Sequence, residues 1–123
     1  MDRTEPKKIL ELLAPAGNMN QACHSIESGC DAVYGGLANW NARMRASNFS
    51  VDEYKRLMEI CQRRGVKFYM TLNTLFKDAE LDALLELLAD VNFVLPDAVI
   101  VADIGLMALL AENFPTLDVH AST

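Results

Sequence analysis

Side chains able to bind ligands or transfer protons follow the apolar runs of this chain. Two arginines in one polar loop can hold a carboxylate or a phosphate through paired N–H donors. A histidine or an aspartate can act as a general acid or base. We therefore predict catalytic roles for His120 and Asp103. Substrate binding is predicted for the remaining polar residues of this set, namely Asn41, Arg43, Arg45, Asn73 and Ser122.

Each of these residues also has a purely structural interpretation. Asp103 can cap the helix that follows it, and this role is compatible with a catalytic one. His120 can be a core histidine bonded to a neighbouring strand, and Asn73 can be a turn residue. Ser122 lacks the Gly-x-Ser-x-Gly setting of a hydrolytic nucleophile, so we assign it to binding. The arginine pair can also belong to a solvated loop.

The elements that must position these side chains alternate between strands and helices. Apolar runs predict strands over 9–14, 32–34, 66–72, 98–102 and 119–121. Helical spacing and caps at Asn18, Ser50 and Asp103 predict helices between them, with a leucine-rich helix reaching position 91. This alternation is typical of βα units around a parallel sheet, whose strands end at one common edge. The candidate residues should therefore meet at that edge.

Four βα units and a fifth strand fit two α/β architectures. One is an open doubly wound sheet, and the other is the N-terminal half of a TIM-type (β/α)₈ barrel. An Asp-Ala-Val sequence at 31–33 and again at 97–99 indicates repeated modules but does not choose between them. A fifth strand without a helix leaves an apolar edge uncovered. We predict a single partial domain over 1–123, with 1–8 flexible, completed by a missing half or by self-association through its open strand edges.

Composition and charge limit the class of protein. Of the 123 residues, 51% are hydrophobic and 23% are charged, which is globular composition. The net charge of −6 excludes a global basic field, so contacts with nucleic acid must be local. No apolar run approaches the length of a membrane span, and we place the chain in the cytoplasm. Cys23, Cys30 and Cys61 lack metal-ligand spacing, so we predict no metal site here.

Six segments of the chain resemble, in order and spacing, the peptidase U32 family. They are ELLAPAGN at 11–18, GCDAVYGG at 29–36, NARMRASNFS at 41–50, TLNT at 71–74, DAVIVADIG at 97–105 and HAST at 120–123. That family has a (β/α)₈-type catalytic domain. The resemblance therefore implies that this chain is the N-terminal half of such a barrel.

The same resemblance implies a set of activities. Members of the family hydroxylate bases of tRNA or rRNA, act as collagenase-like peptidases, or hydroxylate ubiquinone precursors. The hydroxylating members carry a cysteine-ligated iron-sulfur cluster downstream of the matched segment, with prephenate as the oxygen source for RNA. We expect a fragment of an RNA hydroxylase, inactive alone and without a cofactor of its own. A peptidase acting on peptides, a ubiquinone hydroxylase and a non-catalytic half-barrel binding module remain alternatives.

The arginine assignment gives a first prediction. Arg43→Ala and Arg45→Ala in the full-length protein should weaken substrate binding with little loss of stability, because a solvated loop contributes little to the core. Titration of substrate and thermal unfolding of both variants measure the two effects. Unchanged activity in both variants would contradict the assignment.

Overall fold

The computed structural model describes residues 10–37, 49–72 and 77–122, and its elements alternate as predicted. Their order is β1 (Leu13–Pro15), α1 (Met19–Glu27), β2 (Ala32–Gly35), α2 (Val51–Arg64), β3 (Lys67–Leu72), α3 (Asp78–Ala89), β4 (Ala98–Val101), α4 (Ile104–Asn113) and β5 (Asp118–Ala121). Residues 1–8, predicted to be flexible, lie outside the described part.

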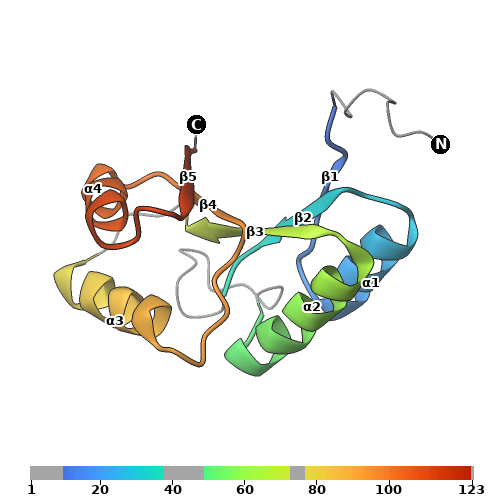
Figure 1. Cartoon of the computed structure of the whole chain (residues 1–123), viewed down its shortest axis with the longest axis horizontal. Coiled ribbons are helices and arrows are strands. Elements are labelled where there is room, and N and C mark those ends of the chain that lie inside the picture. Colours follow the sequence, from blue (N-terminus) through green and yellow to red (C-terminus); the bar gives the residue numbers. More distant parts are fainter. Residues whose placement is uncertain (1–9, 38–48, 73–76, 123) are drawn as a thin grey trace.

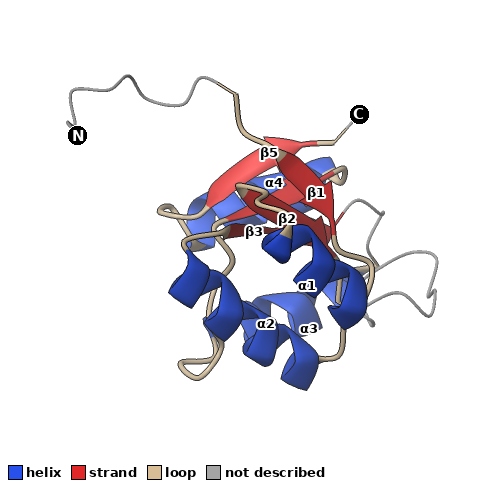
Figure 2. Cartoon of the chain, turned by 90° about the vertical axis from the view of Figure 1, so that its right-hand side faces the viewer, coloured by secondary structure: helices blue, strands red, loops and turns tan. Residues whose placement is uncertain are grey.

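The five strands form one parallel sheet in the sequential order β1-β2-β3-β4-β5. Parallel crossovers share one handedness, so steps in a single direction place the helices on a single face. Figures 1 and 2 show this arrangement, with no helix on the side of the sheet between β5 and β1. A doubly wound sheet would reverse its strand order at a switch point. The sequential order is that of half a (β/α) barrel, as the family resemblance implies.

The predicted helix caps are confirmed by their hydrogen bonds. The Asn18 side chain accepts from the backbone N–H of Gln21 at 2.8 Å, which starts α1. Ser50 and Glu53 form the predicted capping box of α2, with reciprocal bonds of 3.1 and 3.0 Å. The helix then ends at Gly65, whose φ of 68° is a left-handed conformation that favours glycine.

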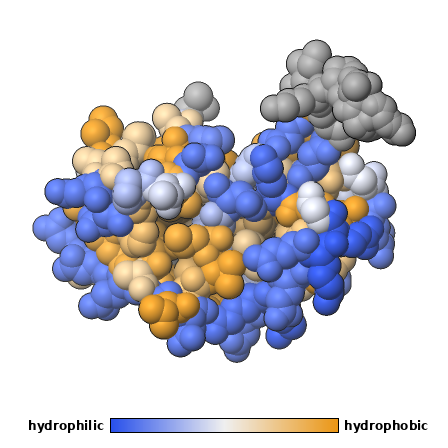
Figure 3. Space-filling model, viewed as in Figure 1, coloured by the Kyte–Doolittle hydropathy of each residue, from blue (hydrophilic) through white to orange (hydrophobic). Residues whose placement is uncertain are grey.

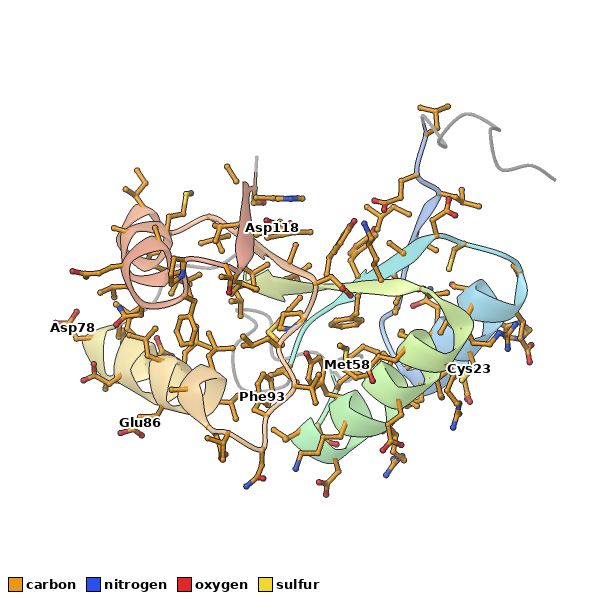
Figure 4. All side chains as sticks on the ribbon, viewed as in Figure 1. Cys23, Met58, Asp78, Glu86, Phe93 and Asp118 are labelled. Atoms are coloured by element: carbon orange, nitrogen blue, oxygen red, sulfur yellow. The ribbon has the colours of Figure 1, made fainter. Side chains whose placement is uncertain are left out.

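Alternation along β3 separates the two faces of the sheet. Phe68, Met70 and Leu72 are fully buried against the helices. Tyr54 of α2 packs edge-on against Phe68 at 5.4 Å and stacks on Phe93 at 5.0 Å, between α2 and the segment that leads into β4 (Figure 4). The residues between these buried ones must then point to the opposite, helix-free face.

The repeated Asp-Ala-Val sequence has one structural role in both copies. Asp31 accepts a hydrogen bond from the backbone N–H of Leu12 through its carboxylate, at 2.7 Å, and its own N–H donates to the Leu12 carbonyl. Asp97 makes the same pair of bonds to Phe68, with 2.8 Å at the carboxylate. Each aspartate therefore ties the start of one strand to its preceding neighbour in the sheet.

Two predicted elements have a boundary that is wrong by more than one residue. The strand expected over 9–14 occupies Leu13–Pro15. Leu12 lies before it, because its N–H donates to the Asp31 carboxylate rather than to a backbone carbonyl, and its side chain is exposed. The leucine-rich helix ends at Ala89 rather than at 91. Val91 is 95% exposed, since the chain turns at Asp90, whose side chain accepts from the N–H of Asn92.

Removing one aspartate clamp should destabilise the sheet. Asp97→Ala in the full-length protein should lower the free energy of unfolding by about 1–3 kcal/mol, because the N–H of Phe68 loses a charged acceptor. Urea unfolding measures the change. Asp82→Ala, on the exposed surface of α3, is the matched control and should have little effect. Equal stability of the two variants would refute the clamp.

Candidate functional site

Three of the predicted site residues, Asp103, His120 and Ser122, lie at the carboxyl edge of the sheet, where β4 and β5 end. Asp103 caps α4 by accepting from the N–H of Leu106 at 3.1 Å, so its structural role is confirmed. Gly105 allows this approach, because a Cβ there would lie 3.2 Å from the Asp103 carboxylate. The N–H of Ser122 donates to the carbonyl of Val101 at 2.7 Å, which extends the pairing of the two strands. A catalytic role for Asp103 and a binding role for Ser122 stay predictions.

The other predicted binding residues, Asn41, Arg43, Arg45 and Asn73, lie outside the described residues, and their roles also stay predictions.

The flanks of segment 38–48 meet at the same edge. Leu37 bridges Phe49, and the Phe49 N–H donates to the Gly36 carbonyl at 2.9 Å. A Cβ on Gly35 would collide with the Ala16 carbonyl oxygen and approach the Phe49 ring to 2.8 Å. Only glycine fits there, and it keeps both flanks close to the end of β2.

The helix-free face of the sheet carries polar and aromatic side chains. Strand register aligns Tyr34, Tyr69, Ala98 and Asp118 in one row and Thr71, Ile100 and His120 in the next. Figure 4 shows Asp118 on the side of β5 that faces the opening toward β1. Figure 3 shows hydrophilic residues beside hydrophobic ones along the top of the molecule, where this face opens. Among the residues that the structure describes, no helix is long and apolar enough to cross a bilayer.

Glu11, Tyr69 and His120 meet on this face. The Tyr69 hydroxyl donates to the Glu11 carboxylate at 2.7 Å. The ring centroids of Tyr69 and His120 lie 5.9 Å apart, with the rings tilted by 57°. His120 is exposed, so its imidazole is accessible to a bound molecule. We refer to these three residues as the open-face cluster.

The environment of Tyr69 keeps its phenol protonated. Burial raises its pKa to about 12, and the bond to Glu11 and the charge of that carboxylate add to the shift. The carboxylates of Asp97 and Asp118 act in the same direction, which places negative charge around the ring. At neutral pH, Tyr69 is therefore a hydrogen-bond donor committed to Glu11.

Sequence reasoning missed two members of this cluster. Tyr69 lies between the buried Phe68 and Met70, so period-two alternation gave a signal that it points away from the core. Glu11 gave none, because it precedes β1 and meets Tyr69 across 58 positions of sequence.

The cysteines lie apart from the open-face cluster. Cys30 and Cys61 are buried, and burial raises the pKa of both thiols, that of Cys61 to about 11. Cys23 is half-buried on α1 (Figure 4). Within the described ranges, no group of three or more His, Cys, Asp or Glu side chains is placed to hold a metal. The described residues therefore do not fit a cysteine-ligated iron-sulfur cluster.

The comparisons with a family model and with curated proteins agree on one family. The model of peptidase family U32 matches residues 17–123. The chain is 35% identical to tRNA hydroxylation protein P of Haemophilus influenzae, 40% to the 23S rRNA 5-hydroxycytidine C2501 synthase of Escherichia coli and 32% to a collagenase of Porphyromonas gingivalis. These alignments cover 91%, 93% and 92% of this chain but 24%, 17% and 27% of the respective relatives. No solved structure matches the chain significantly.

The Glu11–Tyr69 contact can be tested by titration. Glu11→Gln should lower the pKa of Tyr69 from about 12 toward the ordinary value of about 10, because a neutral amide no longer opposes tyrosinate. The difference between the ultraviolet titrations of each protein and its Tyr69→Phe counterpart isolates this residue. An unchanged pKa in Glu11→Gln would show that the carboxylate does not act on the phenol.

Proposed function

The chain belongs to peptidase family U32, and on that premise we propose that it forms the first half of the barrel of an enzyme that hydroxylates a base of tRNA or rRNA. The observation that carries the proposal is sequence similarity to proteins named for RNA hydroxylation. Two of the three relatives described above carry such names, and the rRNA synthase shares the highest identity of the three, 40%.

In this proposal the helix-free face of the sheet receives the substrate. His120 is exposed beside Tyr69 and supplies a group that can exchange a proton with the ring of a base. Arg43 and Arg45 are proposed to hold a phosphate or a carboxylate, and such local contacts suit a chain with a net charge of −6. Asp103 is a further candidate for proton transfer, although its carboxylate also accepts the capping bond of α4.

The remaining machinery belongs to the parts of the protein beyond this chain. An iron-sulfur cluster and prephenate as the oxygen source are part of this proposal, and neither is assigned a site among the described residues. For the cluster, no group of three or more His, Cys, Asp or Glu side chains is placed there to hold a metal. In this proposal the chain contributes substrate binding, orientation and proton transfer. A cytoplasmic location follows from the proposed substrates, tRNA or rRNA.

A peptidase is the second candidate, favoured by the similarity to the collagenase. Nucleophilic proteolysis needs a nucleophile within hydrogen-bond reach of a base. This candidate rests on the similarity to the collagenase alone, whereas two of the relatives described above are named for RNA hydroxylation, so it stays second.

The proposal is tested on cellular RNA. Mass spectrometry of nucleosides from tRNA and rRNA should show a base that gains one oxygen atom in cells with the gene and lacks it in cells without the gene. Addition of the purified full-length protein to gelatin should release no peptides. Unchanged RNA together with gelatin cleavage would replace the proposal by the peptidase.

Substitution of His120 tests its role in that reaction. His120→Gln in the full-length enzyme should reduce RNA hydroxylation about 100-fold, the usual effect of losing a general acid or base. His24→Gln is the matched control, because His24 is an exposed histidine on α1 and lies in the helical layer. Equal hydroxylation by the two variants would remove His120 from the mechanism.

A further inference from the structure

We propose that Tyr69 and His120 form the subsite that binds the flat ring of the RNA base, with Glu11 as the residue that positions Tyr69. This inference rests on the proposed function and names the place where its base binds. The contact between the two rings, the anchoring of Tyr69, and the charge and composition of the helix-free face support it.

The two rings meet across a strand that lies between them. Tyr69 is on β3 and His120 is on β5, and two strand spacings separate these strands by about 9.6 Å. Their ring centroids are nevertheless 5.9 Å apart. The intervening strand presents Ala98, which pairs in register with Tyr69 and is only 1% exposed. Its short side chain leaves the space in which the rings lean together.

Anchoring of the tyrosine makes the pair a defined surface. The hydroxyl of Tyr69 is occupied by its 2.7 Å bond to Glu11, so the phenol cannot rotate freely. Glu11 precedes β1, and the cluster therefore joins the segment before β1 to β3 and β5. A preorganised ring contributes more to binding than a mobile one, because less conformational entropy is lost on association. The exposed imidazole of His120 then offers hydrogen-bonding nitrogens beside a fixed aromatic ring.

The charges on this face select the type of ligand. Glu11 and Asp118 place two carboxylates near Tyr69, and both contribute to the electrostatic environment of its phenol. Lys67 begins β3 two residues before Tyr69 and brings one positive charge to the same face. The net negative charge opposes a phosphate or a carboxylate at this subsite. An uncharged ring with N–H donors, such as a pyrimidine base, matches both the carboxylates and the aromatic surface.

The composition of the face also differs from that of a packed barrel interior. Barrel interiors are filled mainly by bulky branched aliphatic side chains. In the two register rows defined above, Ile100 alone is a branched aliphatic residue, whereas Tyr34, Tyr69 and His120 are aromatic or ionisable. Stacking of bases on aromatic side chains is the usual way in which proteins bind unpaired RNA.

Nuclear magnetic resonance of the full-length protein tests the subsite directly. Cytidine and uridine are added separately, and the imidazole signal of His120, identified by its loss in His120→Gln, is followed. A nucleoside whose ring lies beside His120, or that hydrogen-bonds to its imidazole, should shift this signal. The signal of His24 should stay in place. Inorganic phosphate, added as a separate probe, should leave both signals unchanged.

Variants of the cluster separate stacking from anchoring. Tyr69→Leu should weaken nucleoside binding about tenfold, because the stacking ring is lost. Tyr69→Phe retains the ring but loses the bond to Glu11, and should weaken binding by less. Glu11→Gln retains an acceptor for the hydroxyl and should bind nucleosides nearly as well as the wild type. Glu11→Ala lacks this acceptor and should bind them more weakly. Ala98→Leu should also weaken binding by filling the space between the rings.

The outcomes distinguish this inference from the proposed function. If neither nucleoside shifts the His120 signal of a protein that does hydroxylate RNA, the subsite is overturned and the function stays intact. A phosphate-induced shift as large as that from the nucleosides would also overturn it, in favour of an anion site. A shift by the nucleosides in a protein that leaves RNA unmodified would support the subsite and refute the function.

Discussion

The four described helices all pack on one face of the sheet, because each crossover from β1 to β5 steps in the same direction. This constraint gives each strand one face against helices and one face without them. Phe68, Met70 and Leu72 of β3 satisfy the first requirement, and Tyr69 between them points the other way. The side chains available for chemistry are therefore those that strand alternation places on the helix-free face or that follow the ends of the strands.

The two sides of the sheet use different interactions. On the helix side, apolar burial and the aromatic contacts of Tyr54 stabilise the packing, and aspartate clamps at Asp31 and Asp97 fix the starts of neighbouring strands. On the helix-free side, the open-face cluster is held by a hydrogen bond and a ring contact. This division lets the buried layer define the fold while the other layer carries exposed, ionisable groups.

The sequence predicted local features well and long-range contacts poorly. Helix caps at Asn18 and Ser50 depend on bonds within three residues, so their spacing was sufficient to find them. The choice between a doubly wound sheet and a half-barrel depends on strand order, which the periodicity of individual segments does not contain. The family resemblance supplied that choice, and the sequential order of the strands agrees with it. The contact of Glu11 with Tyr69 joins residues 58 positions apart and had no local signature.

Photo-crosslinking of the full-length protein to its RNA substrate, with mass-spectrometric mapping of the modified residues, tests most directly whether the helix-free face binds the base. The account predicts crosslinks on β3 and β5, at Tyr69 and His120. Crosslinks confined to the outer surfaces of α1 to α4 would contradict it.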